Sequence, residues 1–207
     1  MPENLHKLFV ISSPSGGGKT SLINKLFEDS RSANFKKSIS DTSRQKRQGD
    51  LEGKDYYFLS EKDFKDKIKK EEYVEYATVF GNFYGTSKEE IKTKYNNSNL
   101  ILELDWQGAY AVKELFDDAK LIFLVPPSLD DLKQRLIKRN LDSSKEIESR
   151  LSEAKKEISK SEMYDYLVLN DDFDKAFEDL SQILFEGISP IDFNSRASKD
   201  LIKRLVE

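Results

Sequence analysis

Ser13-Pro14-Ser15-Gly16-Gly17-Gly18-Lys19-Thr20 is the stretch that decides how this chain folds. It follows a short apolar run, Leu8 to Ile11, of the kind that a parallel sheet buries on both faces. Beyond it, apolar residues recur at helical spacing, namely Leu22, Ile23, Leu26 and Phe27. The sequence therefore predicts a buried strand, a glycine-rich loop and a helix in succession.

This loop has the composition of a phosphate-binding loop. Gly16, Gly17 and Gly18 lack a Cβ, so backbone N–H groups can wrap closely around phosphate oxygens. The helix that begins near Lys19 directs its first N–H groups and its positive dipole end at the same oxygens. Lys19 would reach the outer phosphates, and the Thr20 hydroxyl would bind a Mg²⁺ ion whose other ligands are mostly water and phosphate.

The stretch departs at one position from the pattern G-x-x-x-x-G-K-[ST], because Ser13 stands where the pattern has its first glycine. The half that faces the phosphates, Gly18-Lys19-Thr20, is intact. A packing role alone is the alternative interpretation of a glycine-rich turn. The strand, loop and helix context favours phosphate binding.

Composition limits the remaining possibilities. A chain of 207 residues suits one compact domain with small inserted lobes. It contains no cysteine, which excludes disulfides, thiol catalysis and zinc-thiolate sites. A net charge of −4 gives no general reason to expect nucleic-acid binding. No apolar run is long enough to span a bilayer and no secretory signal is recognisable, so we expect a cytoplasmic protein without membrane contact.

Four apolar runs alternate with segments of helical period, which predicts an α/β fold with a parallel sheet flanked by helices. The runs are Leu8 to Ile11, Leu100 to Leu104, Leu121 to Val125 and Tyr166 to Leu169. The predicted helices between and after them are Thr20 to Glu28, Ala109 to Phe116 and Phe173 to Glu186, the last capped by Asp171-Asp172.

Two segments interrupt this alternation. Residues 35–95 are rich in Tyr, Phe and Gly and contain the alternating stretch Tyr73 to Val79, which predicts a mixed lobe with antiparallel strands. Capping-box patterns at Ser60 and Ser87 predict short helices there, and Gly81-Asn82 predicts a turn between two strands.

The second interruption, residues 128–161, is mostly charged and helical. Ser128 is the predicted cap of its first helix, and Asn140 to Ser143 the predicted break before its second. A solvated helical hairpin with ion pairs is the simplest interpretation. In the tail, Ala197, Leu201, Ile202, Leu205 and Val206 share one helical face, which indicates a helix docked on the chain or a subunit contact in a homo-oligomer, with disorder as the competing interpretation.

Several motifs together resemble those of one enzyme family. In chain order they are Ser12 to Thr20, Ser40 to Asp50 with Gly53-Lys54-Asp55-Tyr56, Gly81 to Thr86, Leu102 to Gly108, Pro126-Pro127-Ser128 and Asn170-Asp171-Asp172. This series resembles the guanylate kinase family, whose members transfer the γ-phosphoryl group of ATP to GMP. The resemblance implies a P-loop core of residues 1–34, 96–127 and 162–187, a GMP-binding lobe of residues 35–95, a lid of residues 128–161 and a tail of residues 188–207.

The resemblance also implies the residues that bind GMP. Arg44 and Arg47 offer planar forks for its phosphate, and Tyr56 and Tyr84 add hydroxyl donors. Asp50 stands where the family usually has a longer carboxylate. The alternative for the two arginines is a surface ion pair with Asp41 or Asp50.

Guanine recognition falls to Glu75, Ser40 and Thr86 by the same resemblance. A carboxylate can accept both N1–H and N2–H of guanine, whereas adenine presents an acceptor at N1 that a carboxylate would repel. Glu103 and Asp105 follow a core strand, where they would orient Lys19 and the acceptor or hold metal-bound water. A helix-capping role alone is the alternative for these two acids.

On the donor side, the resemblance implies that ATP is bound by Ser13 to Thr20, Arg135 and Asn170. Lys19, Arg139 and Arg150 would surround the transferring group and neutralise its charge. The family usually has glycine where this chain has Asn140. Asn tolerates a left-handed backbone better than most residues, so the turn there is compatible with it. The two inserted segments would close on the nucleotides and exclude water.

Two other functions fit part of the pattern. Guanylate-kinase-like domains also serve as non-catalytic protein-binding modules, but these typically have eroded phosphate loops, and Gly18-Lys19-Thr20 is intact here. A P-loop kinase for another phosphorylated acceptor is the second alternative. The joint presence of Arg44, Arg47 and Glu75 favours GMP. ATP and GMP, with Mg²⁺, are therefore the expected partners.

Overall fold

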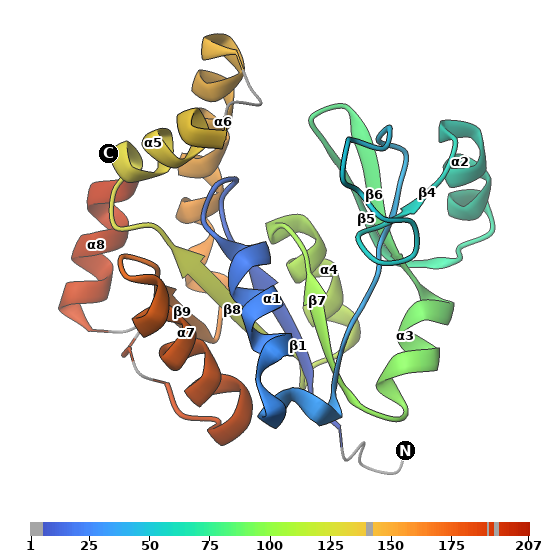
Figure 1. Ribbon diagram of the computed structural model, residues 1–207, viewed down its shortest axis with the longest axis horizontal. Helices are drawn as coiled ribbons and strands as arrows, with labels where there is room; N and C mark the ends of the chain where they lie inside the picture. Colours follow the sequence, from blue (N-terminus) through green and yellow to red (C-terminus); the bar gives the residue numbers. More distant parts are fainter. Residues whose placement is uncertain (1–5, 140–142, 190, 193–194) are drawn as a thin grey trace. The chain divides into compact units, whose positions relative to one another are not determined.

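The computed structural model describes residues 6–139, 143–189, 191–192 and 195–207, and it divides the chain into two compact units. The first unit consists of Met1–Val10 and Asn34–Ala119, and the second of Ile11–Ala33 and Lys120–Glu207. Figure 1 labels most of the helices and strands of both. The glycine-rich loop belongs to the second unit, and the tyrosine-rich stretch belongs to the first.

The structure confirms the predicted α/β fold. Within the described residues, one sheet has five strands in the order β2-β7-β1-β8-β9, and its pairs β2–β7 and β8–β9 are parallel. Every residue of β1 is buried, as is every residue of β8 after Lys120, which explains why these strands have apolar runs rather than alternation. The strands are β1 (Leu8–Ser12), β2 (Phe35–Lys37), β7 (Asn99–Glu103), β8 (Lys120–Val125) and β9 (Tyr166–Leu169).

The sequence analysis did not predict β2 as a strand of this sheet. It has only three residues, and of these only Phe35 is buried, so it shows no apolar run. The ring of Phe35 stacks on that of Phe9 at a centroid distance of 6.0 Å, and the backbone of β2 pairs with β7. A strand this short is recognisable only from its tertiary partners.

A second, mixed sheet lies within the first unit and has the order β4-β3-β6-β5. Along β5, Tyr73, Glu75 and Ala77 are buried while Tyr76 and Thr78 are exposed, so one face of this strand is turned inward. Helix α4 packs against β5. The elements are β3 (Asp41–Thr42), β4 (Tyr57–Phe58), β5 (Tyr73–Val79), β6 (Asn82–Ser87), α2 (Glu61–Lys69), α3 (Lys88–Tyr95) and α4 (Trp106–Leu115).

The sequence predicted the helix caps of this unit correctly but misplaced its hairpin turn. Ser60 and Ser87 cap α2 and α3 as expected, each accepting a hydrogen bond from the amide three residues later. The turn between β5 and β6 is formed by Phe80 and Gly81, whose φ angles are 48° and 77°, and the prediction of Gly81-Asn82 was wrong by one residue. A hairpin of this kind needs two left-handed residues, and an aromatic residue at the first of them gives no sequence signal.

The second unit consists mainly of helices around β8 and β9. Ser128 caps α5 and Asp172 caps α7, as predicted. Ser143, predicted only as part of the break before the second helix, forms a capping box with Glu146 at the start of α6. The predicted break at Asn140 falls on residues 140–142, outside the described residues. The helical elements are α1 (Lys19–Glu28), η1 (Ser30–Asn34), α5 (Leu129–Arg139), α6 (Ser144–Ser159), η2 (Ser161–Met163), α7 (Phe173–Ser181), the π-helical turn η3 (Gln182–Glu186) and α8 (Arg196–Val206).

The tail forms a helix docked on its own chain, the first of the three alternatives. Helix α8 packs against α6 (Figure 1), and Leu205 is only 3% exposed. Lys155 on α6 donates a hydrogen bond to the carbonyl oxygen of Glu207 at 2.9 Å. Ala197, predicted to share the apolar face, is exposed instead. No helix among the described residues combines the length and apolar character needed to cross a membrane.

Candidate active site

The loop between β1 and α1 has the backbone that its glycines predict. Gly16 (φ 90°) and Gly18 (φ 92°) adopt left-handed conformations that residues with a Cβ rarely tolerate. The Gly17 amide donates to the Pro14 carbonyl at 2.8 Å, which closes a tight turn. Gly18 supplies no side-chain cap to α1, and the first turn of this helix carries no acidic residue. This helix N-terminus therefore has the electrostatic character of an anion site.

Packing imposes the same requirement for glycine. A Cβ on Gly16 would lie 3.1 Å from side-chain carbons of both Leu132 and Leu136 on α5. A Cβ on Gly18 would lie 2.4 Å from Nδ2 of Asn170, far inside van der Waals contact. Ser13, which replaces the first glycine of the pattern, is buried and donates its hydroxyl to the Pro14 carbonyl at 3.2 Å.

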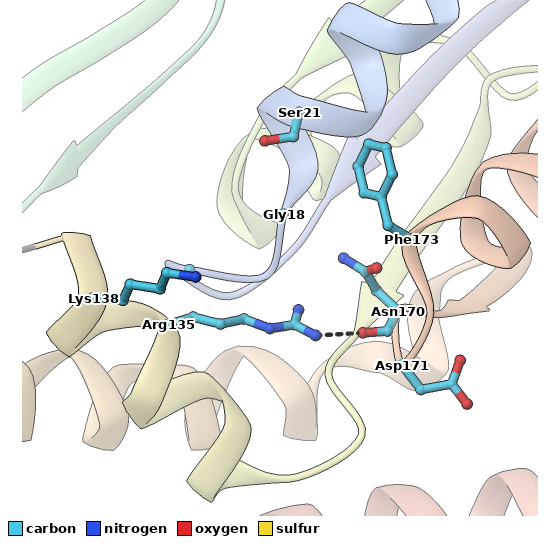
Figure 2. Close-up of a pocket in the computed structure, with 8 residues that line it drawn as sticks. Gly18, Ser21, Arg135, Lys138, Asn170, Asp171 and Phe173 are labelled. Carbon is cyan, nitrogen blue, oxygen red and sulfur yellow. Dashed lines mark hydrogen bonds between the residues drawn. The ribbon is translucent and has the colours of Figure 1, made fainter.

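Asn170, at the end of β9, holds the loop directly. Its buried side-chain amide donates to the carbonyl oxygen of Gly17 at 2.6 Å. Arg135 on α5 donates from Nη2 to the backbone carbonyl of Asn170 at 2.8 Å, the dashed line in Figure 2. Two residues that were predicted from separate motifs are thus joined in one network around the glycine loop.

A pocket of about 410 Å³ opens beside this network. Its volume lies in the range of small-molecule sites, and it combines apolar, cationic and amide groups. Figure 2 shows its lining residues, which come from the glycine loop, α1, α5, the segment after β9 and the first residue of α7. The lining residues are Gly16, Gly18, Ser21, Arg135, Lys138, Asn170, Asp171 and Phe173.

The remaining predicted donor-site residues have these positions. Arg150 on α6 donates from Nη1 to the hydroxyl of Ser15 at 2.7 Å, which connects the predicted lid to the loop. Lys19 is partly buried and Thr20 is exposed, both in the first turn of α1. Arg139 ends α5, and its side chain lies outside the described part of the chain, as does all of Asn140.

In the first unit, Glu75 is a buried carboxylate. It is 5% exposed and lies opposite Thr86 in the register of β5 and β6. Among the described residues, no group forms a hydrogen bond with its Oε1 atom. The pKa of Glu75 is raised to about 7, chiefly by burial and in smaller part by the charge of Asp105, against hydrogen bonds from Thr86 that lower it. The Ser40 hydroxyl lies 3.4 Å from that of Thr86, so the three residues predicted for guanine lie together.

The predicted phosphate-binding residues of this unit also cluster. Arg44 lies over the Tyr56 ring at 5.4 Å and pairs with Asp50 at 2.9 Å, so the ion-pair alternative is realised for this arginine. Tyr84 contacts the edge of Tyr56 at 5.7 Å between ring centroids. Burial raises the pKa of Tyr56 to about 12, so its hydroxyl stays protonated and can donate.

Arg47 and the two strand-end acids complete this description. Arg47 is exposed, and its backbone amide donates to the Asp50 carboxylate at 2.7 Å. Glu103 pairs with Lys37 at 2.8 Å. Asp105 caps α4 by accepting the Gly108 amide at 2.9 Å, which is the capping role considered as the alternative. Its charge also contributes to the raised pKa of Glu75.

Sequence reasoning missed several side chains of both sites. Lys138 lines the pocket one helical turn after Arg135, and this spacing was a usable signal. Phe173 lines the same pocket directly after the Asn170-Asp171-Asp172 motif. Phe58 provides a second ring beneath Arg44, at 5.5 Å, and was visible only as one more aromatic residue of the lobe.

Comparisons with known proteins show which family the chain belongs to. The guanylate kinase family model matches residues 5–187. A guanylate kinase of Wolbachia sp. subsp. Brugia malayi (strain TRS) is 46% identical over 184 residues, 88% of this chain and 93% of its own length. That of Coxiella burnetii (strain RSA 493 / Nine Mile phase I) is 42% identical over 99% of this chain and 98% of its own.

Structural comparison gives the same result. The crystal structure of guanylate kinase from Anaplasma phagocytophilum matches with a TM-score of 0.73 and 32% identity, covering 99% of this chain and 98% of that one. The matched length includes the glycine loop, the buried carboxylate and the arginine and tyrosine cluster. This chain belongs to the guanylate kinase family.

Proposed function

We propose that this protein is an ATP:GMP phosphotransferase, which moves the γ-phosphoryl group of ATP to GMP and releases ADP and GDP. The observation that carries the proposal is the buried carboxylate of Glu75, whose Oε1 atom accepts no hydrogen bond from the described residues. A buried acceptor of this kind is costly unless a ligand supplies a donor. Guanine supplies two donors on one edge.

Guanine selectivity follows from the chemistry of this carboxylate. The ionised Glu75 can accept N1–H and N2–H of guanine, while the hydroxyls of Ser40 and Thr86 lie beside it. Adenine would present a lone pair at N1 to the same carboxylate. A site with buried polar groups rejects a base that leaves them unpaired by as much as about 10⁴-fold.

The acceptor phosphate needs cations and neutral donors. Arg44, fixed by Asp50 and by the rings of Tyr56 and Phe58, presents a guanidinium for it, and Arg47 adds a second cation. The hydroxyls of Tyr56 and Tyr84 are additional donors. Asp50 then acts by orienting Arg44 and the Arg47 backbone. The attacking atom is a phosphate oxygen that is already ionised near neutral pH, so the reaction needs no side-chain base.

The residues on the ATP side of the site neutralise the negative charge of the phosphates. Amides of the glycine loop and Lys19 would bind the β- and γ-phosphates, and the pocket beside Arg135 and Asn170 would hold the rest of ATP. Arg150 already contacts the loop through Ser15, and Arg139 is assigned the same charge-neutralising role from the family pattern. Such an arginine contributes about 10³-fold or more to the rate in related phosphoryl transfers.

A magnesium ion fits one feature of this site. Thr20 is exposed in the first turn of α1, directly after the loop, so its hydroxyl can serve as one oxygen ligand. Phosphate oxygens and water would supply the other ligands. When bound, the ion neutralises charge on the phosphate oxygens of ATP.

Several assignments stay predictions. The lobe and lid boundaries, residues 35–95 and 128–161, are proposed from the family pattern. So is a cytoplasmic location, which the cysteine-free sequence favours. Measuring the mass in solution before and after deletion of residues 189–207 tests whether the tail also forms a subunit contact in a homo-oligomer.

The first prediction concerns the acceptor. With Mg²⁺ and ATP, the purified protein should release ADP rapidly with GMP and with dGMP, and at least about 10³-fold more slowly with AMP, UMP or CMP. A coupled ADP-release assay measures kcat/KM for each acceptor. Binding of ATP without turnover of GMP would support the non-catalytic module, and a preference for another monophosphate would support the second alternative.

The second prediction concerns Glu75. Glu75→Gln should raise KM for GMP by about 10-fold or more, because the amide offers one acceptor and a conflicting donor. It should also stabilise the ligand-free protein at pH 8 by roughly 1 to 3 kcal/mol, since it removes a buried charge. Urea unfolding and steady-state kinetics measure the two effects, with the exposed Glu89→Gln as the matched control.

The sign of the pH dependence distinguishes this account from a merely exposed glutamate. The pKa of Glu75 is raised from 4.5 to about 7, so the folded protein retains a proton that the unfolded chain has lost between these values. The stability advantage of Glu75→Gln should therefore grow from pH 4.5 to 7 and then level off. As the pH falls below about 7, the KM of the wild type for GMP should rise more steeply than the KM of the variant. The rise in the variant is due only to the titration of the GMP phosphate. Parallel profiles would contradict the assignment.

The third prediction concerns Asn170. The side-chain amide of Asn170 holds the Gly17 carbonyl. Asn170→Ala should therefore raise the Kd for ATP and the Kd for inorganic tripolyphosphate by about 10-fold each. Isothermal titration with both ligands tests this, and Glu178→Ala, exposed on α7, is the control. A loss confined to ATP would show instead that Asn170 contacts only the nucleoside.

A further inference from the structure

Gly108 occupies an unusual position beside the candidate guanine site. It lies in the first turn of α4, is buried, and donates its amide to Asp105 at 2.9 Å. Its backbone is helical, and it is absent from the described residues with positive φ. Glycine is among the least favourable residues in a helix, so the backbone conformation gives no reason for its presence here.

The surroundings of Gly108 supply that reason. A Cβ at this position would lie 2.9 Å from Oε2 of Glu75 and 3.3 Å from the carboxyl carbon of the same side chain. It would also lie 3.2 Å from the Cβ of Leu104. These distances are shorter than carbon and oxygen atoms normally allow, because contacts in protein interiors lie near 3.5 to 4.0 Å. Any side chain at position 108 must therefore displace a neighbour.

The neighbour that would move can be identified. Leu104 Cβ is fixed to the backbone at the end of β7 and is buried, so it has little freedom. The carboxyl group of Glu75 is the far end of a side chain with rotatable bonds; Thr86 hydrogen-bonds to it, but its Oε1 atom has no hydrogen bond from the described residues. The carboxylate would therefore yield before the helix does, and the protein would keep its fold while the carboxylate changed position.

We propose that Gly108 is a positioning residue that determines acceptor specificity: its missing side chain lets the Glu75 carboxylate rest against α4 with Oε2, leaving Oε1 directed to the acceptor base. The proposal rests on the proposed function, since it concerns how that function selects guanine. Gly108 itself contacts neither the base nor the reacting phosphates in this account. Its only effect is that the absence of a Cβ leaves space for the Glu75 carboxylate.

The test is Gly108→Ala, analysed with GMP and AMP as acceptors. KM for GMP should rise by about 10-fold or more, while kcat at saturating GMP changes less than about 3-fold and KM for ATP is unchanged. The preference for GMP over AMP should narrow by the same factor as KM rises. The melting temperature should not fall, because alanine favours the helix and the displaced group is a flexible side-chain end.

A double variant provides the positive control. Glu75→Asp shortens the carboxylate by one methylene group, so it should impair GMP binding alone. The loss of GMP binding in the double variant Glu75→Asp with Gly108→Ala should be smaller than the sum of the losses in the two single variants, since the shorter side chain avoids the new Cβ. Glu114→Ala, exposed on the same helix, should leave kinetics and melting temperature unchanged.

The outcomes separate the inference from the function on which it rests. If the wild type does not phosphorylate GMP, the proposed function fails. If the wild type does so and Gly108→Ala keeps the wild-type KM and acceptor preference, the positioning role is wrong. A lower melting temperature with an equal loss of kcat for every acceptor would also overturn it, because that pattern indicates a structural glycine.

Discussion

The structure of the second unit depends on how closely other side chains approach the glycine loop. Leu132 and Leu136 of α5 reach the position that a Cβ of Gly16 would take, and Asn170 reaches the corresponding position at Gly18. The same Asn170 binds the Gly17 carbonyl and is itself held by Arg135. The loop is thus fixed by α5 and by the end of β9 as well as by its own turn. Amides that are oriented before a phosphate arrives need no reorganisation when it binds, which is where their electrostatic benefit arises.

In the proposed function, the first unit has a different task, the recognition of a neutral base edge. It performs this task with a carboxylate that is buried at a cost, since burial raises the pKa of Glu75 to about 7. A protein selected for stability alone would replace this group or give it a donor. Its retention without a donor to Oε1 from the described residues indicates that the donor is meant to come from a ligand. Glycine at position 108 also favours recognition over stability, because it lowers the stability of the helix but leaves room for the carboxylate.

Much of this could be predicted from the sequence, for identifiable physical reasons. The long strands were predicted because β1 and β8 are buried on both faces, and the helix starts at Ser60, Ser87 and Ser128 were predicted because capping is local chemistry. The glycine loop between β1 and α1 was predicted because its glycines, lysine and threonine have fixed spacing. Strand β2 was missed because three residues cannot show a period, and the hairpin turn was misplaced because Phe80 adopts a left-handed backbone without any sequence sign.

The sequence predicted which residues form the proposed site but not the contacts between them. Nothing local indicates that Asn170 binds Gly17 across 153 positions of sequence separation, or that Arg150 reaches Ser15. The sequence left open whether Asp105 caps a helix or takes part in function, and the structure shows that it caps α4 while its charge acts on Glu75. The state of a buried carboxylate depends on its whole environment, so no sequence pattern could give the pKa of Glu75.

The central claim is that a carboxylate of the protein accepts the hydrogen-bonding edge of guanine. NMR of ¹⁵N-labelled GMP bound to the protein tests this claim directly, because the N1–H proton of the base can be observed only when it is protected from exchange with water. The account predicts a downfield, slowly exchanging N1–H signal in the wild type that disappears or moves strongly upfield in Glu75→Gln at saturating GMP. A bound base whose N1–H exchanges as in free GMP, or whose signal is the same in both proteins, would contradict it.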